Sequence, residues 1–234
     1  MITYNSKQFV RDLLLRLGNP FNIASFSPQH KMLIELKPYD SVLHIGANIG
    51  QELSLYHFIG PKRVIWIEPD KAAYNKLKLR GYFYRKFKNI YIQACISDKT
   101  GFATSYFEFN ESGANSNFKP TNSFLDSRKS RYITKVSSVT TTNIEDALNN
   151  QNINFSTKNN LLVIDVQGNE MSVLIGFKKE TLENFRVIMC EFSQDQYENN
   201  FSTSKLRSKL QSFGYIEVLA PIRSSDDAIF IRKS

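Results

Sequence analysis

The sequence has little cysteine and no long apolar run. Among 234 residues only Cys95 and Cys190 are cysteines, and both lie in apolar stretches typical of buried strands. Such a pair fits small core residues better than a disulfide framework. No apolar run reaches the length of a membrane-spanning helix, and the N-terminus mixes charges into an amphipathic pattern that is unlike a signal peptide. These absences favour a reducing cytoplasm and exclude a membrane span.

Signals of several common catalytic classes are also missing. The three histidines, His30, His44 and His57, show no metal-ligand spacing. The chain contains neither a GxSxG nucleophile elbow nor a phosphate-binding P-loop. We therefore expect no metal site and no serine-nucleophile chemistry.

The charge balance is basic, with a formal net charge of +8. Part of the excess lies in one segment, KLKLRGYFYRKFK, at residues 76–88. This segment is interpreted either as a solvated helix and loop with aromatic residues packed inward, or as a basic face for anionic partners. The length suits one domain, so we expect a helical extension at residues 1–40 and a single domain at residues 41–234.

The most informative stretch is SVLHIGANIGQE, from Ser41 to Glu52. A short apolar strand ends there in two glycines, Gly46 and Gly50, which allow the backbone to approach a ligand closely before a helix begins. A second apolar strand, VIWIE, ends at Glu68, about 20 residues after Gly46, where a doubly wound sheet places the acid that binds ribose hydroxyls. Together the two strands predict an adenosine site.

Helical and strand patterns alternate along most of the chain, which predicts an α/β fold with a doubly wound sheet. The predicted helices are 5–17, 30–36, 50–58 and 71–79, and the predicted strands are 42–45, 64–67, 90–95, 161–165 and 187–191. Residues 214–219 and 228–231 predict an antiparallel closing hairpin. One polar segment, Asn110 to Lys135, breaks the alternation and is interpreted either as a mobile surface insertion or as a substrate-gating loop.

Three of the apolar strands end in acids, Glu68, Asp165 and Glu191. Because the carboxyl ends of parallel strands line the ligand crevice of an open α/β sheet, these acids are expected to converge. Glu170 follows Asp165 closely in the motif IDVQGNE and is expected at the same rim. His44 and Glu52 flank the glycine turn, and each is also explained by an ordinary structural role, as a core histidine and as a charge at a helix start.

Several ordered motifs resemble the FkbM-type methyltransferases. They are LHIGANIGQE, VIWIEPDKAAYNKL, ACISDKTG, NLLVIDVQGNEMSVLIGF, CEFSQDQY and DDAIFIRK, and together they span roughly residues 40 to 233. Matching motifs in the same order are far more specific than a single glycine loop. The chain departs from the pattern at Asn48 and Gln51, which replace a histidine and a glutamate, and its serine-rich segment is only loosely present as ANSN at residues 114–117.

The resemblance implies a Rossmann-like sheet of seven strands with the last one antiparallel. It implies S-adenosylmethionine as cofactor and methyl transfer to a hydroxyl, typically of a sugar or glycan, which the basic charge suggests is anionic or nucleotide-linked. The implied cofactor-binding residues are Gly46, Ala47, Asn48, Gly50, Glu52, Glu68, Pro69, Ser97, Asp98 and Asp165, and the implied catalytic residues are Asp165, Glu191, His44 and Glu170.

Three other functions remain as alternatives. An NAD-dependent oxidoreductase is disfavoured because Gly46, Asn48 and Gly50 form GxNxG rather than the GxGxxG that seats a pyrophosphate. A nucleic-acid methyltransferase fits the charge, but the Asp165 motif lacks the Asn/Asp-Pro-Pro-aromatic run of base amino-methylases, so we do not expect nucleic acid as the substrate. A non-catalytic binding module with the same fold is the third alternative.

Overall fold

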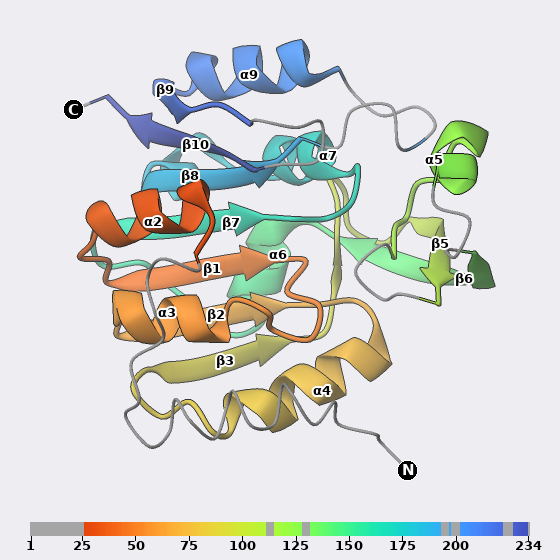
Figure 1. Ribbon diagram of the computed structural model, residues 1–234, viewed down its shortest axis with the longest axis horizontal. Helices are drawn as coiled ribbons and strands as arrows, with labels where there is room; N and C mark the ends of the chain where they lie inside the picture. The colour runs from red at the N-terminus through yellow and green to blue at the C-terminus, as the bar shows by residue number, and fades with distance from the viewer. Residues whose placement is uncertain are drawn as a thin grey trace.

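The computed structural model describes residues 26–110, 115–127, 132–192, 197, 202–221 and 227–233. A large central sheet lies between two layers of helices, and a smaller sheet stands beside it (Figure 1). The helix predicted at residues 5–17 lies outside the described residues. None of the helices in the described ranges is long and apolar enough to cross a membrane.

The central sheet contains seven strands in the order β3-β2-β1-β7-β8-β10-β9. Strands β1, β2, β3, β7 and β8 run parallel, and β10 is antiparallel to both β8 and β9. This confirms the predicted doubly wound sheet, its antiparallel last strand and the closing hairpin. The bounds are β1 Ser41–Ile45, β2 Arg63–Ile67, β3 Lys88–Ile92, β7 Asn160–Ile164, β8 Phe185–Glu191, β9 Tyr215–Leu219 and β10 Asp227–Arg232.

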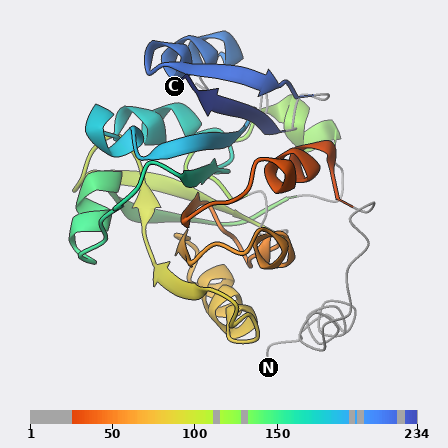
Figure 2. The ribbon, with the colours of Figure 1, turned by 90° about the vertical axis from the view of Figure 1, so that its left-hand side faces the viewer.

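Each face of this sheet is covered by its own helices (Figure 2). Strand residues alternate between the faces, so Leu43 and Ile45 of β1 belong to one apolar core and Val42 to the other. On the Val42 face lie α2 (Pro28–Glu35), α3 (Leu53–Ile59) and α4 (Lys71–Gly81); on the other lie α6 (Ile144–Asn149), α7 (Glu170–Ile175), α8 (Lys179–Leu182) and α9 (Thr203–Ser212). Both predicted core cysteines are buried.

The strand order reverses between β1 and β7. From β1 the chain proceeds outward through β2 and β3, and it later returns to place β7 on the other side of β1. Loops at the carboxyl ends of β1 and β7 therefore leave in opposite directions, which opens a crevice between them. The sheet topology thus places any ligand site at the ends of β1, β2 and β7.

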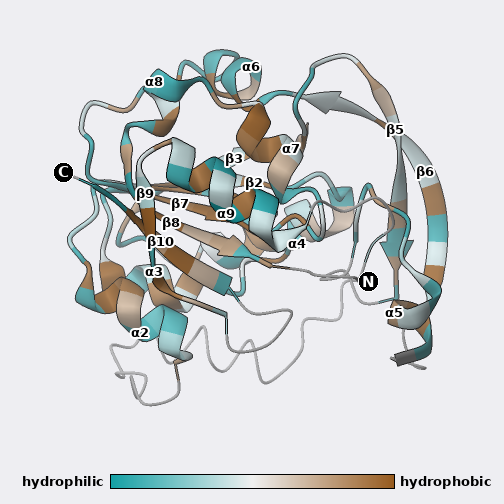
Figure 3. Ribbon diagram, turned by 90° about the horizontal axis from the view of Figure 1, so that it is seen from above, coloured by the Kyte–Doolittle hydropathy of each residue, from teal (hydrophilic) through white to brown (hydrophobic). Residues whose placement is uncertain are grey.

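A second sheet of three strands, in the order β4-β6-β5, was not predicted. It consists of β4 (Cys95–Ile96), β5 (Ala103–Phe109) and β6 (Ile133–Thr142), and the helix α5 (Asn122–Ser127) lies between β5 and β6 in the chain. The predicted strand 90–95 is therefore wrong at its end, because β3 stops at Ile92 and Cys95 pairs with Thr141 in the other sheet. Strands β5 and β6 stand beyond the arrowheads of the parallel strands (Figures 1 and 3).

Candidate functional site

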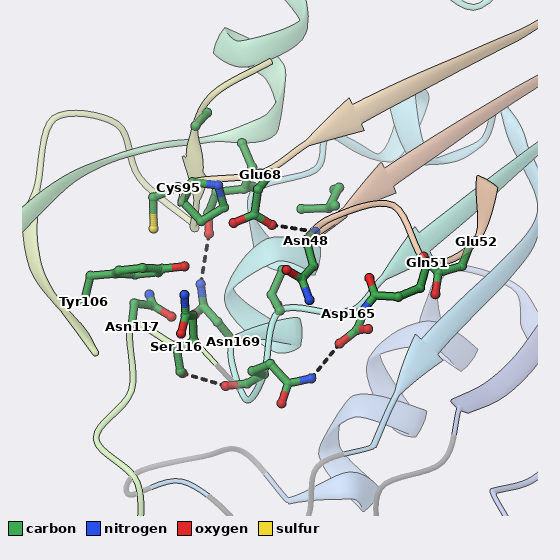
Figure 4. A pocket seen from close by; sticks show the side chains of 18 residues that line it. Asn48, Gln51, Glu52, Glu68, Cys95, Tyr106, Ser116, Asn117, Asp165 and Asn169 are labelled. Carbon is green, nitrogen blue, oxygen red and sulfur yellow. Dashed lines mark hydrogen bonds between the residues drawn. The ribbon is translucent and has the colours of Figure 1, made fainter. Parts of the chain in front are cut away.

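A cavity lies between the carboxyl ends of the central strands and the smaller sheet (Figure 4). Its walls come from the turn after β1, the ends of β2 and β7, the segment before β4, Tyr106 of β5 and residues 115–117. Part of the polar segment between Asn110 and Lys135 therefore forms a wall of this cavity.

The turn after β1 requires glycine at its first position. Gly46 has φ +86, and a Cβ atom there would lie 1.7 Å from the backbone oxygen of Asp165. The amides of Gly46 and Ala47 donate to the carbonyl of Ile67 at 2.9 and 3.0 Å, which ties the turn to β2. Asn48 continues the turn at φ 45, a left-handed conformation that asparagine tolerates better than most residues. The turn thereby brings Asn48 into the cavity wall.

Glu68 follows β2 directly and is held by two backbone amides. Its Oε2 accepts from the Asn48 amide at 2.7 Å, and its Oε1 accepts from the Asp70 amide at 2.8 Å. Burial raises the pKa of Glu68 to about 8, although these two hydrogen bonds favour the charged form. Each carboxylate oxygen keeps a lone pair after these contacts. Glu68 lines the cavity and can accept from ligand hydroxyls there, and its binding of ribose stays a prediction.

Asp165 and Glu191 are joined through one side-chain amide. Nε2 of Gln167 donates to Oδ1 of Asp165 at 2.7 Å and to Oε2 of Glu191 at 2.7 Å. Burial raises the pKa of Asp165, against hydrogen bonds from Glu191 and Gln167, and burial with the nearby Asp165 charge raises the pKa of Glu191 well above its usual value. Asp165 lines the cavity, whereas Glu191 does not. Of the three acids predicted to converge, Glu68 and Asp165 line the same cavity, and Asp165 shares the Gln167 amide with Glu191.

Glu52 lies just before α3 and also faces the cavity. Burial, followed by the negative charge of Asp165, raises its pKa to about 8. Glu52, Glu68 and Asp165 therefore place three carboxyl groups around one cavity. A cation bound among them would favour their ionised forms.

Like Glu191, the predicted catalytic residues His44 and Glu170 do not line the cavity. His44 points to the α3 side of the sheet, where its Nδ1 is 2.9 Å from the Tyr56 hydroxyl and burial lowers its pKa to about 3. Glu170 accepts from the Gly168 amide at 3.0 Å at the start of α7, and burial raises its pKa to about 7. His44 Nδ1 also lies 4.0 Å from the carboxylate of the wall residue Glu52, and Glu170 binds the backbone between the wall residues Gln167 and Asn169.

The other predicted cofactor-binding residues fall into two groups. Pro69 joins Gly46, Asn48, Glu52, Glu68 and Asp165 in the wall, whereas Ala47, Gly50, Ser97 and Asp98 do not line the cavity. Ser97 donates to its neighbour Asp98 at 3.2 Å. Within the described ranges, no group of three or more histidine, cysteine, aspartate and glutamate side chains is arranged to hold a metal ion.

Several wall residues were not among the predicted site residues: Tyr106, Asn115, Ser116, Asn117, Gln167 and Asn169. Asn169 is buried, its Nδ2 donates to the Ile96 carbonyl at 2.9 Å, and its Oδ1 has no hydrogen-bond partner among the described residues. Gln167 and Asn169 belong to the IDVQGNE motif, so the motif itself carried a signal for them. Nothing in the local pattern places Tyr106 at the site.

Comparison with known proteins was made at the levels of sequence and structure. The family model described as the methyltransferase FkbM domain matches residues 44–217. None of the curated proteins compared with the chain matches its sequence. Among solved structures, the methyltransferase FkbM from Methylobacillus flagellatus KT is similar, with TM-score 0.52 and 15% identity over 82% of this chain. The chain spans 43% of the length of that protein.

Two further solved structures match over most of both chains. Precorrin-6y C5,15-methyltransferase from Geobacter metallireducens GS-15 has TM-score 0.49 and 10% identity, covering 92% of this chain and 94% of its own. The O-methyltransferase from Bacillus cereus in complex with SAH has TM-score 0.41 and 12% identity, covering 100% and 94%.

Proposed function

The chain belongs to the FkbM methyltransferase family, and we propose that it methylates a hydroxyl group, most simply one of a sugar or glycan. It is an S-adenosylmethionine-dependent methyltransferase with the Rossmann-like fold of that class. The proposal concerns the acceptor atom and the acceptor class.

The residues of the cavity fit the cofactor. The buried Oδ1 of Asn169, which has no partner among the described residues, is an acceptor suited to the amino group of adenine. Glu68 offers carboxylate oxygens to ribose hydroxyls. Glu52 and Asp165 are carboxyl groups of raised pKa, and a positively charged sulfur nearby would favour their ionised forms. The cofactor therefore satisfies groups that are otherwise costly to bury.

The reaction needs positioning and one proton acceptor. When bound, S-adenosylmethionine would supply an activated methyl group, and its sulfur would keep the electron pair of the methyl–sulfur bond once the acceptor oxygen holds the methyl. Asp165 takes the proton that leaves the hydroxyl, and Gln167 holds the carboxylate of Asp165 in place. The walls align the acceptor, which supplies much of the rate enhancement. A positioned base contributes a further ~10²- to 10⁴-fold.

The observation that carries the proposal is the half-buried carboxyl group of Asp165 in the cavity wall, linked to a second half-buried acid, Glu191. A base works best when its pKa lies near the operating pH, and burial moves the pKa of Asp165 upward in that direction. Hydroxyl acceptors need such a base because their protons are weakly acidic. The amide side chains of Gln51, Asn115 and Asn117 in the wall suit an acceptor with many hydroxyl groups.

A screen of acceptors tests the proposal. Formation of S-adenosylhomocysteine would be measured with purified protein and three panels: neutral and phosphorylated sugars, amines, and short RNA or DNA. We expect turnover with a sugar hydroxyl, loss of turnover when that hydroxyl is replaced by hydrogen, and loss of most turnover in Asp165→Asn. Transfer to an amine or to nucleic acid would contradict the proposal. Binding of S-adenosylhomocysteine without transfer to any panel would favour the non-catalytic module.

A further inference from the structure

Gln167 occupies a backbone conformation that its residue type rarely adopts. It follows β7 with φ 54, and among the described residues only Asn48 and Asn152 are other non-glycine residues with positive φ. Such conformations persist where the surroundings fix the residue, and they cluster at functional sites. The side chain of Gln167 is fixed by the contacts that its amide makes.

Every hydrogen-bonding group of the Gln167 amide is in use. Its Nε2 donates at 2.7 Å to both Asp165 and Glu191, and its Oε1 accepts from the Tyr197 hydroxyl at 3.1 Å. Its backbone carbonyl accepts from the Ser116 hydroxyl at 2.6 Å. In Figure 4, Ser116 and Asp165 lie at opposite ends of the dashed hydrogen bonds that the residue between them makes. One residue therefore connects the ends of β7 and β8 to the segment that walls the cavity on the side of the smaller sheet.

The groups around Asp165 and Glu191 explain why these two acids need Nε2 of Gln167 as a hydrogen-bond donor. The other titratable groups that face the pair are Glu52, Tyr56, Glu68, Glu170, Cys190 and Asp227, which come from α3 and its preceding turn, β2, α7, β8 and β10. Six side chains of this region, including the pair itself, thus end in carboxyl groups. Neither Asp165 nor Glu191 has an ion-pair partner in the part of the chain that the structure describes. The neutral Gln167 amide is a donor to both.

We propose that Gln167 is a positioning residue that holds Asp165 and Glu191 as one proton-accepting pair and couples the pair to the Ser116 wall. The inference rests on the proposed function. Two donated hydrogen bonds favour the ionised form of the pair, so that it is ready to accept a proton from the substrate. The contacts of Ser116 and Tyr197 fix the glutamine, and through it they fix the direction of the Asp165 carboxylate.

Gly168 makes room for Tyr197, the residue that donates to the Gln167 side chain. It has φ +102, and a Cβ atom there would lie 2.8 Å from the ring of Tyr197. The missing side chain lets the Tyr197 ring pack against the turn, with its hydroxyl directed to Gln167. Tyr197 also contacts the α5 segment, through ring contact with Phe124 and a backbone bridge to Pro120. The turn is thus enclosed by the same segment that supplies Ser116.

Two variants of Gln167 separate a positioning role from a general loss of structure. Gln167→Met keeps the length and neutrality of the side chain but removes both donors, and Gln167→Glu keeps the shape but adds a carboxyl group. Gln151→Leu, at an exposed glutamine outside the cavity wall, is the matched control. The carboxyl groups would be titrated by carbon-13 NMR in the cofactor-free protein, with Asp165→Asn used to assign the signals. This measurement needs no acceptor.

We expect both Gln167 variants to raise the apparent pKa values of the pair by about one unit or more, because a donor to a charged acceptor is lost. Gln151→Leu is expected to leave the titration unchanged. With a working acceptor, the acid limb of the kcat profile should move to higher pH by a similar amount, while the Kd for S-adenosylhomocysteine changes less than about threefold. Folded Gln167 variants whose carboxyl titrations match wild type would overturn the inference. Shifted titrations without transfer to any hydroxyl would instead reject the proposed function.

Discussion

At the scale of single residues, Glu68 carries the clearest prediction about cofactor binding. Glu68→Gln keeps the size of the side chain, but its amide nitrogen cannot accept from a backbone amide or from ribose hydroxyls that donate. Hydrogen bonds to charged groups contribute ~1.5–3 kcal/mol, so the Kd for S-adenosylhomocysteine should rise roughly 10- to 100-fold. Calorimetric titration measures this change. Glu217→Gln, on β9 outside the cavity wall, is the control and should bind as wild type does.

The raised pKa of Glu52 predicts how the free energy of unfolding depends on pH. Its pKa is raised from 4.5 to about 8 in the folded protein, mainly by burial. Between these values the folded state binds more protons than the unfolded state, so the contribution of Glu52 to the free energy of unfolding falls as pH rises toward 8. Because glutamine does not titrate, Glu52→Gln removes this pH-dependent loss of stability. The Glu52 side chain makes no capping hydrogen bond to α3, so the substitution breaks none.

The Glu52 prediction is tested by unfolding the cofactor-free protein at a series of pH values. Relative to wild type, Glu52→Gln should gain at least ~1 kcal/mol at pH 9, or roughly 2–4 °C in Tm for a chain of this size, and the gain should shrink toward pH 5. Equal pH dependence in the two proteins would show that this carboxyl group does not titrate as described.

At the scale of elements, local patterns predicted the central sheet well. The strands β1, β2, β7 and β8 are apolar on both faces because helices cover both sides, and such runs stand out in a sequence. The glycine turn was predictable for the same reason, since Gly46 and Gly50 interrupt an apolar run. Element boundaries were less well predicted: α3 begins at Leu53, not at Gly50, because the turn continues through Glu52.

The smaller sheet was missed because its strands are largely exposed. In β6, ITKVSSVTTT, only Thr141 is buried, and β-branched residues alternate with serine and lysine rather than forming an apolar run. The β-branched content was a usable signal, since threonine and valine favour strands. The pairing of β5 with β6 was harder to predict, because the polar segment with Asn and Ser separates them in the chain.

Gly46→Ala tests the turn between β1 and β7. The added Cβ atom would overlap the Asp165 carbonyl at 1.7 Å, so the backbone must move in addition to bearing a strained φ of +86. Gly101→Ala is a matched control, because Gly101 has φ +85 and nothing within 4 Å of its Cβ position. We expect Gly46→Ala to lose ~1–3 kcal/mol more than the control in urea unfolding, and to lose cofactor binding. Equal losses in the two variants would contradict the overlap.

At the scale of the whole molecule, the site joins parts of the chain that no local pattern connects. The hydrogen bond from Ser116 to the carbonyl of Gln167 links residues 51 positions apart, and it joins the segment after β5 to the turn after β7. Motif spacing predicted the wall formed by the central strands, since parallel strands share one carboxyl edge. The wall formed by residues 115–117 follows from tertiary packing, which the sequence specifies only through contacts distributed along the whole chain.

This two-sided construction makes a prediction for hydrogen–deuterium exchange. S-adenosylhomocysteine should slow exchange in peptides from both walls, the turn at residues 46–52 and the segment at residues 115–117, because both line the same cavity. Strand β9 at the far edge of the sheet should exchange as before and serves as the internal control. Glu68→Gln should weaken both effects at a ligand concentration that saturates wild type. Protection confined to the turn at 46–52 would mean that the ligand contacts the central sheet alone and that residues 115–117 do not close the cofactor site.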